Sequence, residues 1–170
     1  AEALPYAMKA LGLSLEEAQR QLRQESGLKG LSGVSNDIRE VQEAASSGNR
    51  AAQMAIDVFV ASARHWIGSY YFELNGADAI VFTAGIGENR PEIREAICAN
   101  LDQLGIVLDP ERNRSTRAAE GVVSADSSTV KVLVIPTNEE LVVAREVKRF
   151  LEKNRPPART PFPSQLSTVK

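Results

Sequence analysis

Two glycines mark the stretch of this chain with the clearest capacity for chemistry. Gly85 and Gly87 separate a short apolar run at 77–82 from a helix that begins at Pro91. Glycine can take positive φ and lets a ligand approach the backbone, and unpaired N–H groups at a helix start attract anions. The stretch from Gly85 to Asn89 therefore predicts a strand, a glycine turn and a helix start that hold the polar part of a nucleotide. A tight turn without any ligand is an equally good interpretation, because Gly-x-Gly lacks the remaining residues of the dinucleotide and Walker fingerprints.

Glu88 indicates which part of a nucleotide this turn would contact. A carboxylate is not placed against a phosphate, but it can accept hydrogen bonds from ribose hydroxyls. We therefore expect the turn to bind the nucleoside end.

A second candidate lies at Asp37, Ile38 and Arg39, directly after a stretch rich in Gly, Ser and Asn at 28–37. Ligand contacts are concentrated in such loops. In one interpretation a carboxylate and a guanidinium face a ligand. In the other, which the residues alone favour, Asp37 caps the next helix and Arg39 is solvated.

Glu139 is the third candidate. Thr137 and Glu140 have the spacing of a capping box, which gives Glu140 a structural role and leaves Glu139 free in the first turn. Ligands of open α/β sheets bind at the carboxyl ends of strands, where Glu139 is expected. A single carboxylate there suits a Mg²⁺ that keeps several waters and bridges to phosphates, although the helix dipole alone also favours an acid.

The remaining reactive residues point to packing. His65, the only histidine, lies beside Trp66 in a long helical pattern, and Cys98 is expected in or near the core. One cysteine excludes an internal disulfide framework and a cysteine-based zinc site, and it suits a reducing compartment such as the cytoplasm. The sequence offers no Ser-His-Asp, Cys-His or metal-ligand constellation.

The elements that must position these residues alternate between strands and helices, which indicates the α/β class. Residues 28–37 and 111–120 are expected to be loops. The apolar stripe of the long helix, from Ala52 to Leu74, is wide enough to pack on a sheet or a partner chain. The apolar residues of the last helix are expected to face inward. Helices are expected at 4–11, 14–26, 37–45, 50–74, 91–104 and 137–153, and strands at 78–82, 121–123 and 130–135.

Length and composition limit the size class of the protein and the kinds of partner it can have. The chain has 170 residues, of which 43% are hydrophobic and 25% charged, as in a soluble globular domain or a large piece of one. A net charge of −2 gives no reason to expect nucleic acid or an anionic membrane as partner. No apolar run approaches the roughly 20 residues that span a bilayer, and no signal peptide is visible. Three strands are few for this many apolar helix faces, so we expect either that the sheet continues in an absent segment or that another chain covers it.

Together the three candidate stretches resemble the carboxy-terminal portion of the acetate kinase (acetokinase) family. The resemblance runs over nearly all of residues 1 to about 150, and the set of three motifs is very specific. The matching stretches are Ser26-Gly27-Leu28 through Gly33-Val34-Ser35-Asn36-Asp37-Ile38-Arg39, Ile80-Val81-Phe82-Thr83-Ala84-Gly85-Ile86-Gly87-Glu88-Asn89, and Val134-Ile135-Pro136-Thr137-Asn138-Glu139-Glu140-Leu141.

The resemblance implies part of a ribonuclease H-like, actin-like ATPase domain of the sugar kinase/Hsp70/actin superfamily, with helices packed on a small, mostly parallel sheet. It implies transfer of the γ-phosphoryl group of ATP to acetate, with ATP/ADP and Mg²⁺ as cofactors. By the resemblance, Asp37, Ile38 and Arg39 line the nucleotide site, and Glu139 binds magnesium. Adenosine or its flanking groups would contact Gly85, Ile86, Gly87, Glu88 and Asn89.

Several family features have no counterpart in this sequence. The family's early Asn-x-Gly-Ser-Ser loop, its acetate pocket, its catalytic arginines and aspartate, and its His-x-Gly-x-Gly phosphate loop all precede the matched region. We therefore expect residues 1–153 to be the C-terminal part of the nucleotide-binding domain, with no catalytic residue of their own, and 154–170 to be a disordered, proline-rich tail.

The expected partners are acetate and acetyl phosphate, bound by the absent domain, and a second copy of the chain, because the family dimerises through this region. The isolated chain is expected to be inactive. Two alternatives stay open: a propionate or butyrate kinase relative, and a non-catalytic fragment that binds nucleotide or only self-associates.

Overall fold

The computed structural model describes residues 3–154, except for the side chain of Glu139. The chain forms two units, Ala1–Pro136 and Thr137–Lys170. Within the described residues, no helix is long and apolar enough to cross a membrane.

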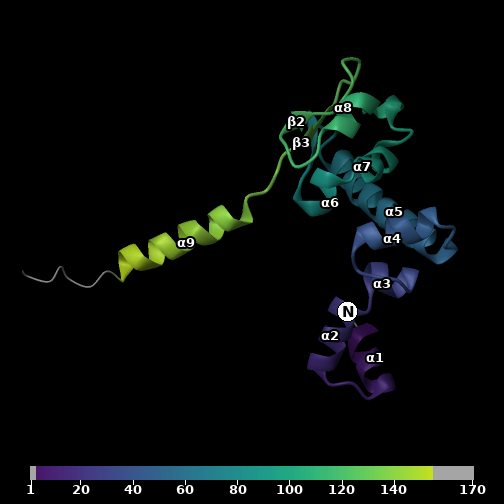
Figure 1. Ribbon diagram of the computed structural model, residues 1–170, viewed down its shortest axis with the longest axis vertical. Coiled ribbons are helices and arrows are strands. Elements are labelled where there is room, and N and C mark those ends of the chain that lie inside the picture. Colours follow the sequence, from purple (N-terminus) through teal and green to yellow (C-terminus); the bar gives the residue numbers. More distant parts are fainter. Residues whose placement is uncertain (1–2, 155–170) are drawn as a thin grey trace, which may run out of the picture. The chain divides into compact units, whose positions relative to one another are not determined.

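The first unit combines many helices with a small sheet, which confirms the expected α/β class, although the helices and strands do not alternate regularly (Figure 1). Its helices are α1 (Ala3–Leu11), α2 (Leu15–Gln24), α3 (Gly27–Ser32), α4 (Ile38–Ser46), α5 (Arg50–Glu73), α6 (Ala84–Asn89), α7 (Pro91–Cys98), the 3-10 helix η1 (Asp102–Leu104) and α8 (Pro110–Ser115). Its strands are β1 (Ala79–Phe82), β2 (Gly121–Val122) and β3 (Lys131–Val134).

The sheet has the order β1-β3-β2, with β3 in the centre. Strands β1 and β3 are parallel, with Ala79 opposite Lys131 and Phe82 opposite Val134. Strand β2 is antiparallel to β3. The sheet is therefore mixed, because the short connection from β2 to β3 leaves no room for the crossover that a parallel neighbour requires.

The core lies between this sheet and the helices α5 and α7. Val132 and Val134 of the central strand are fully buried, and α7 contributes Ile93, Ile97 and Cys98. Burial raises the pKa of the Cys98 thiol to about 11, as expected for a core cysteine without reactivity. The helix α5 packs on this core with Ile56, Phe59, Val60, Ala63, Ile67 and Tyr71, and α4 lies alongside it (Figure 1).

The expected stripe of α5 was too wide. Trp66, Tyr70 and Leu74 are each more than half exposed. One residue turns a helix by about 100°, so Trp66 points well away from the core face that carries Ile67. Only one part of the stripe reaches the core.

The expected glycine turn is wrong, because residues 84–89 form the helix α6. The residue with positive φ is Ala84, at 59°, and neither Gly85 nor Gly87 has a left-handed conformation. A side chain on Gly87 would place its Cβ 3.3 Å from the backbone carbon of Phe82. Gly87 is needed because α6 lies directly against the end of β1.

Other expected boundaries also need correction. A helix, α3, lies within the stretch expected as a loop at 28–37, and α8 occupies half of the one at 111–120. Asp109 caps α8 by accepting hydrogen bonds from the backbone N–H groups of Glu111 and Arg112. Asp109-Pro110 is thus a helix start with the proline at the first helical position. The helix expected at 91–104 ends at Cys98, because Ala99 is already extended, with a ψ of 137°, and Asn100 follows with a φ of 56°.

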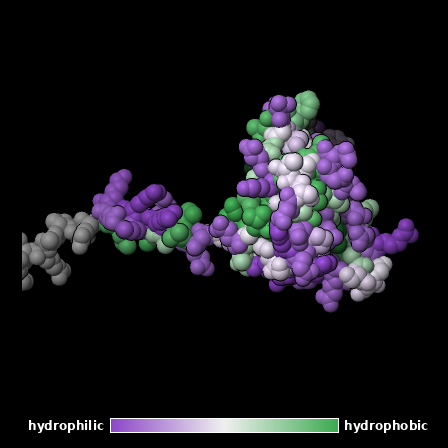
Figure 2. Space-filling view, turned by 90° about the horizontal axis from the view of Figure 1, so that it is seen from above, coloured by the Kyte–Doolittle hydropathy of each residue, from purple (hydrophilic) through white to green (hydrophobic). Residues whose placement is uncertain are grey.

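The second unit contains α9 (Glu139–Lys153). Its N-cap is Asn138, whose side chain accepts a hydrogen bond from the backbone N–H of Leu141 at 2.8 Å. The expected capping box is therefore wrong: the N-cap is Asn138 and not Thr137, and the N3 position is occupied by Leu141 and not by Glu140. The apolar residues expected to face inward, such as Val143 and Phe150, are exposed. Figure 2 shows hydrophobic residues gathered on one side of α9, and the described residues of this unit provide no core for them.

The two glycines of α6 make a matched pair for a stability measurement. An alanine at Gly85 would meet no atom within 4 Å, whereas one at Gly87 would press on Phe82. Both changes gain the helix propensity of alanine, roughly 1 kcal/mol, but only Gly87→Ala adds an overpacking cost of about 1–3 kcal/mol. In urea unfolding we expect Gly85→Ala to be neutral or stabilising and Gly87→Ala to be less stable than Gly85→Ala by at least about 1 kcal/mol. Equal stabilities would contradict the close packing of α6 on β1.

Candidate functional site

A cavity of about 790 Å³ brings two of the three candidate stretches together. One wall is the start of α4 and the other is α6 with the residue that follows it. The lining residues are Asn36, Asp37, Ile38, Arg39, Gly85, Ile86, Asn89, Arg90 and Arg117. We call this cavity the α4/α6 pocket.

Asp37 and Arg39 form a local unit at the start of α4. The carboxylate of Asp37 accepts the backbone N–H of Arg39 at 2.8 Å, which caps the helix. The same carboxylate accepts hydrogen bonds from the guanidinium of Arg39. These side-chain hydrogen bonds, followed by the backbone one, lower the pKa of Asp37 to about 2. Asp37 is thus a cap and also a pocket residue that stays ionised at neutral pH, so the two interpretations of this stretch are compatible.

Ile38 fixes this unit to the rest of the fold. Its side chain is buried in the core cluster that contains Phe82 and Ile93. The start of α4 therefore lies at a set position relative to β1 and α7, even though Arg39 itself is exposed.

Only part of the glycine stretch lines the pocket. Gly85, Ile86 and Asn89 do, and the side-chain amide of Asn89 donates to the carbonyl of Gly85 at 3.1 Å. Gly87 lies against Phe82 instead, and Glu88 is buried outside the set of lining residues. The structure thus separates these two residues from the others with which the sequence grouped them.

Two lining residues, Arg90 and Arg117, were missed by the sequence analysis. The guanidinium of Arg117 donates to the carbonyl of Asn89 at 3.0 Å and forms a longer ion pair with Glu92 at 3.4 Å. Arg90 adjoins the glycine stretch, and its proximity to Asn89 was the signal that could have identified it. Arg117 lies in a polar stretch far along the chain, where no pattern distinguishes it.

The charge of the pocket follows from these residues. Asp37 offsets one of the three lining arginines, Arg39, with which it is paired. Arg117 is paired with Glu92, which does not line the pocket, and Arg90 has no carboxylate partner among the lining residues. A pocket with excess guanidinium groups and exposed backbone suits a ligand that carries an anionic group.

Glu139 takes part in none of these contacts as far as the structure describes them. Its backbone begins α9, and its side chain lies outside the described residues. Among the described side chains there is no group of three or more His, Cys, Asp or Glu that could hold a metal. A Mg²⁺ that takes one or two carboxylates and otherwise binds waters and phosphate oxygens does not need such a group.

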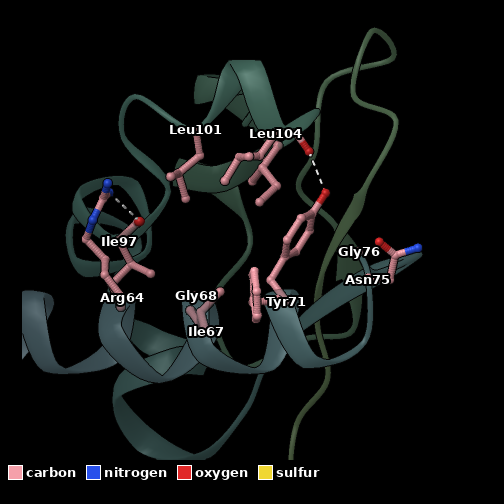
Figure 3. A pocket seen from close by; sticks show the side chains of 11 residues that line it. Arg64, Ile67, Gly68, Tyr71, Asn75, Gly76, Ile97, Leu101 and Leu104 are labelled. Carbon is pink, nitrogen blue, oxygen red and sulfur yellow. Dashed lines mark hydrogen bonds between the residues drawn. The ribbon is translucent and has the colours of Figure 1, made fainter.

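A second cavity, of about 600 Å³, lies between α5 and the segment from α7 to η1 (Figure 3). Its walls are mainly apolar side chains such as Ile67, Ile97 and Leu101. The guanidinium of Arg64 donates to the carbonyl of Ile97 at 2.8 Å, and the hydroxyl of Tyr71 donates to the carbonyl of Leu104 at 3.0 Å (Figure 3). The side chains of Arg64 and Tyr71 thus donate to backbone carbonyls, and we do not consider this cavity a site for chemistry.

Comparison with known proteins agrees with the motif resemblance. Acetate kinase from Natranaerobius thermophilus is 47% identical over 150 residues, which are 88% of this chain and 37% of that protein. The crystal structure of Porphyromonas gingivalis acetate kinase matches with a TM-score of 0.76 at 36% identity, over 87% of this chain and 37% of that one. A propionate kinase from Francisella tularensis subsp. tularensis matches with a TM-score of 0.71 at 38% identity, over 84% and 36% of the two chains.

The chain therefore spans little more than a third of the length of these relatives. The description of the family model that matches is the acetokinase family, and the match runs over residues 1–145. A match over most of the chain, with the three motifs inside it, shows that the chain belongs to the acetokinase family.

Proposed function

We propose that this chain is part of a kinase that transfers the γ-phosphoryl group of ATP to acetate, giving acetyl phosphate and ADP. In this proposal the α4/α6 pocket binds the adenine nucleotide. Membership of the acetokinase family supports the reaction. One observation carries the site: Asp37–Arg39 and Gly85–Asn89, which are distant in sequence and match the family's motifs separately, contribute lining residues to one cavity.

Five of the lining residues have roles that their chemistry supports. Gly85 and Ile86 leave backbone and apolar surface open to a nucleobase. Asp37 keeps acceptor capacity beyond its bonds to Arg39, because a carboxylate has about four lone-pair sites, and it can accept from ribose hydroxyls. Arg39 and Asn89 donate hydrogen bonds. Phosphoryl transfer depends mainly on positioning and on stabilising charge, so the contribution of these residues is to hold and orient the nucleotide.

Glu88 and Gly87 fit this site as supporting residues. Gly87 allows α6 to lie on β1, and the backbone carbonyl of Glu88 accepts a hydrogen bond from Arg94 at 3.0 Å. Their effect on the nucleotide is through the position of α6.

The cofactor and the cellular setting are further parts of the proposal. Glu139 supplies one carboxylate to a Mg²⁺ that arrives with the nucleotide and neutralises phosphate charge. Acetate and acetyl phosphate bind to parts of the enzyme that this chain does not contain. The kinase acts in the cytoplasm as a homodimer, and the exposed aromatic residues Trp66 and Tyr70 of α5 are available for self-association.

A propionate or butyrate kinase is the nearest alternative. The similarity to a propionate kinase structure favours it almost as much as the similarity to acetate kinases favours the first proposal. The choice of acceptor depends on residues outside this chain, whereas the nucleotide pocket is the same in both cases. The other alternative, a fragment that binds nucleotide or only self-associates, agrees with the limited span of the chain.

Arg39→Ala tests the pocket without disturbing the helix cap, because the cap uses the backbone N–H of Arg39. A charge-assisted hydrogen bond contributes roughly 1.5–3 kcal/mol, so the Kd for ATP·Mg measured by calorimetric titration should rise about tenfold or more. Lys29→Ala is the matched control. Lys29 is a cation on α3 that is paired with Glu25 and is not among the lining residues of the pocket. A binding isotherm that does not respond to Arg39→Ala would remove α4 from the site.

Glu139→Ala tests the metal role separately. If Glu139 holds a nucleotide-bound Mg²⁺, the change weakens binding of ATP·Mg by about tenfold and leaves the Kd for ATP in EDTA unchanged. Glu140→Ala, at the neighbouring position of α9, is the control and should change neither value. Equal losses with and without Mg²⁺ would show that Glu139 does not act through the metal.

The 170-residue chain by itself should not catalyse the reaction, since the sequence offers no counterpart of the family's catalytic arginines and aspartate. With acetate, ATP, Mg²⁺ and hydroxylamine, we expect no acetyl hydroxamate above the blank, while a full-length acetate kinase gives the product under the same conditions. Hydroxamate formed by the purified chain would show that it carries the acceptor site as well.

A further inference from the structure

Arg94, on α7, is fully buried and donates five hydrogen bonds. Burial lowers the pKa of its guanidinium below the ordinary value, although an arginine remains protonated in proteins. None of its hydrogen bonds goes to a carboxylate. A buried charge is tolerated only where polar groups surround it, and here those groups are one side-chain amide oxygen and four backbone carbonyls.

The carbonyls belong to the C-terminal ends of two short helices. Nη1 donates to Gly87 at 2.7 Å and to Glu88 at 3.0 Å, near the end of α6. Nη2 donates to Asn113 at 2.7 Å and to Thr116 at 2.8 Å, at the end of α8. The last carbonyls of a helix have no partner within it and carry the negative end of its dipole. One cation thus satisfies both helix ends and fixes the distance between them.

Asn113 completes the connection. Its side-chain oxygen accepts from Nε of Arg94 at 2.8 Å, and its side-chain nitrogen donates to the carbonyl of Pro91 at 2.9 Å. Both Arg94 and Asn113 are buried, so water cannot replace these bonds readily.

Both helix ends lead directly into the α4/α6 pocket. Asn89 and Arg90 follow the carbonyls of α6, and Arg117 follows Thr116 at the end of α8. The segment after α8 runs along α6, where the backbone N–H of Ala118 donates to the carbonyl of Glu88 at 3.4 Å. Ala118 has a φ of 47°, a conformation that a non-glycine residue keeps only where its surroundings hold it.

We propose that Arg94 is a positioning residue for nucleotide binding, which holds Arg117 at the pocket so that its guanidinium donates to an anionic group of the nucleotide. The inference rests on the proposed function, because it takes the α4/α6 pocket as the nucleotide site. Arg94 itself does not line the pocket and acts through the segment that carries Arg117.

A double-mutant cycle tests this coupling. The Kd for ATP is measured by calorimetry on the 170-residue chain, on Arg94→Lys, on Arg117→Ala and on the double variant. Lysine keeps the charge but concentrates its donors on one atom, so it cannot reach both helix ends. We expect each single change to raise the Kd about tenfold, and the double variant to bind no more weakly than Arg94→Lys alone, because the contact of Arg117 is already lost.

Arg64→Lys is the matched control for a structural effect. Arg64 also donates to backbone carbonyls, those of Ile97 at 2.8 Å and Ala99 at 2.7 Å, but it lines the other cavity. The Arg64→Lys change should lower the unfolding temperature and leave the Kd for ATP unchanged. Partial unfolding would reduce the stoichiometry of binding and not the Kd of the folded molecules, so the two effects are separable. If Arg94→Lys does not fold, Asn113→Ala, which removes one of the five acceptors, takes its place with an expected threefold rise in Kd.

Hydrogen exchange at the amide of Ala118 separates failure of the inference from failure of the proposed function. We expect this amide to exchange at least tenfold faster in Arg94→Lys than in the unmodified chain or in Arg64→Lys. If the amide exchanges faster in Arg94→Lys but the unmodified chain binds no ATP, the proposed nucleotide site is contradicted, whereas the role of Arg94 in positioning the segment of Arg117 is supported. Unchanged exchange, an unchanged Kd in Arg94→Lys, or additive effects in the double variant would overturn the inference.

Discussion

Each hydrogen bond that the buried guanidinium of Arg94 donates to the described residues goes to a backbone carbonyl or to the side-chain oxygen of Asn113, so the backbone must bring carbonyl groups to it. This requirement joins the C-terminal ends of α6 and α8, which are separated by α7 and η1 along the chain. Without that guanidinium, the carbonyls of Gly87, Asn113 and Thr116 would lose the side-chain donor that satisfies them, and an unsatisfied buried carbonyl costs about 1–3 kcal/mol. The position of Asn89, Arg90 and Arg117 depends on the same interaction, so the pocket and the stability of this part of the fold have a common origin.

Two close contacts connect this cluster to the sheet. Gly87 lets α6 lie against Phe82 at the end of β1, and Ile38 anchors the start of α4 in the core that β1 and β3 form. The side chains of Arg39 and Arg117 are exposed at this pocket. A fixed backbone with exposed guanidinium groups suits a ligand that is recognised through its charge and its hydroxyls.

The sequence predicted the fold where local chemistry decides it. Asp37 as a cap and Pro91 at the first position of α7 both act within a few residues. It failed where a tertiary contact decides. Gly87 packs against Phe82 in the strand that precedes α6, and the place of Arg117 depends on its contact with Asn89, 28 residues earlier. Periodicity cannot identify such partners, and it also cannot say which part of an apolar stripe meets a core, as Trp66 on α5 shows.

The central claim is that the α4/α6 pocket is the nucleotide site. Its most direct test is a two-dimensional NMR titration of the isotopically labelled chain with ADP. The account predicts that shifted amide signals cluster at 36–39, 85–90 and 117–118, whereas the signals of residues that line the second cavity, such as Ile67 and Leu101, stay in place. Shifts confined to that second cavity, or no shifts at millimolar ADP, would contradict it.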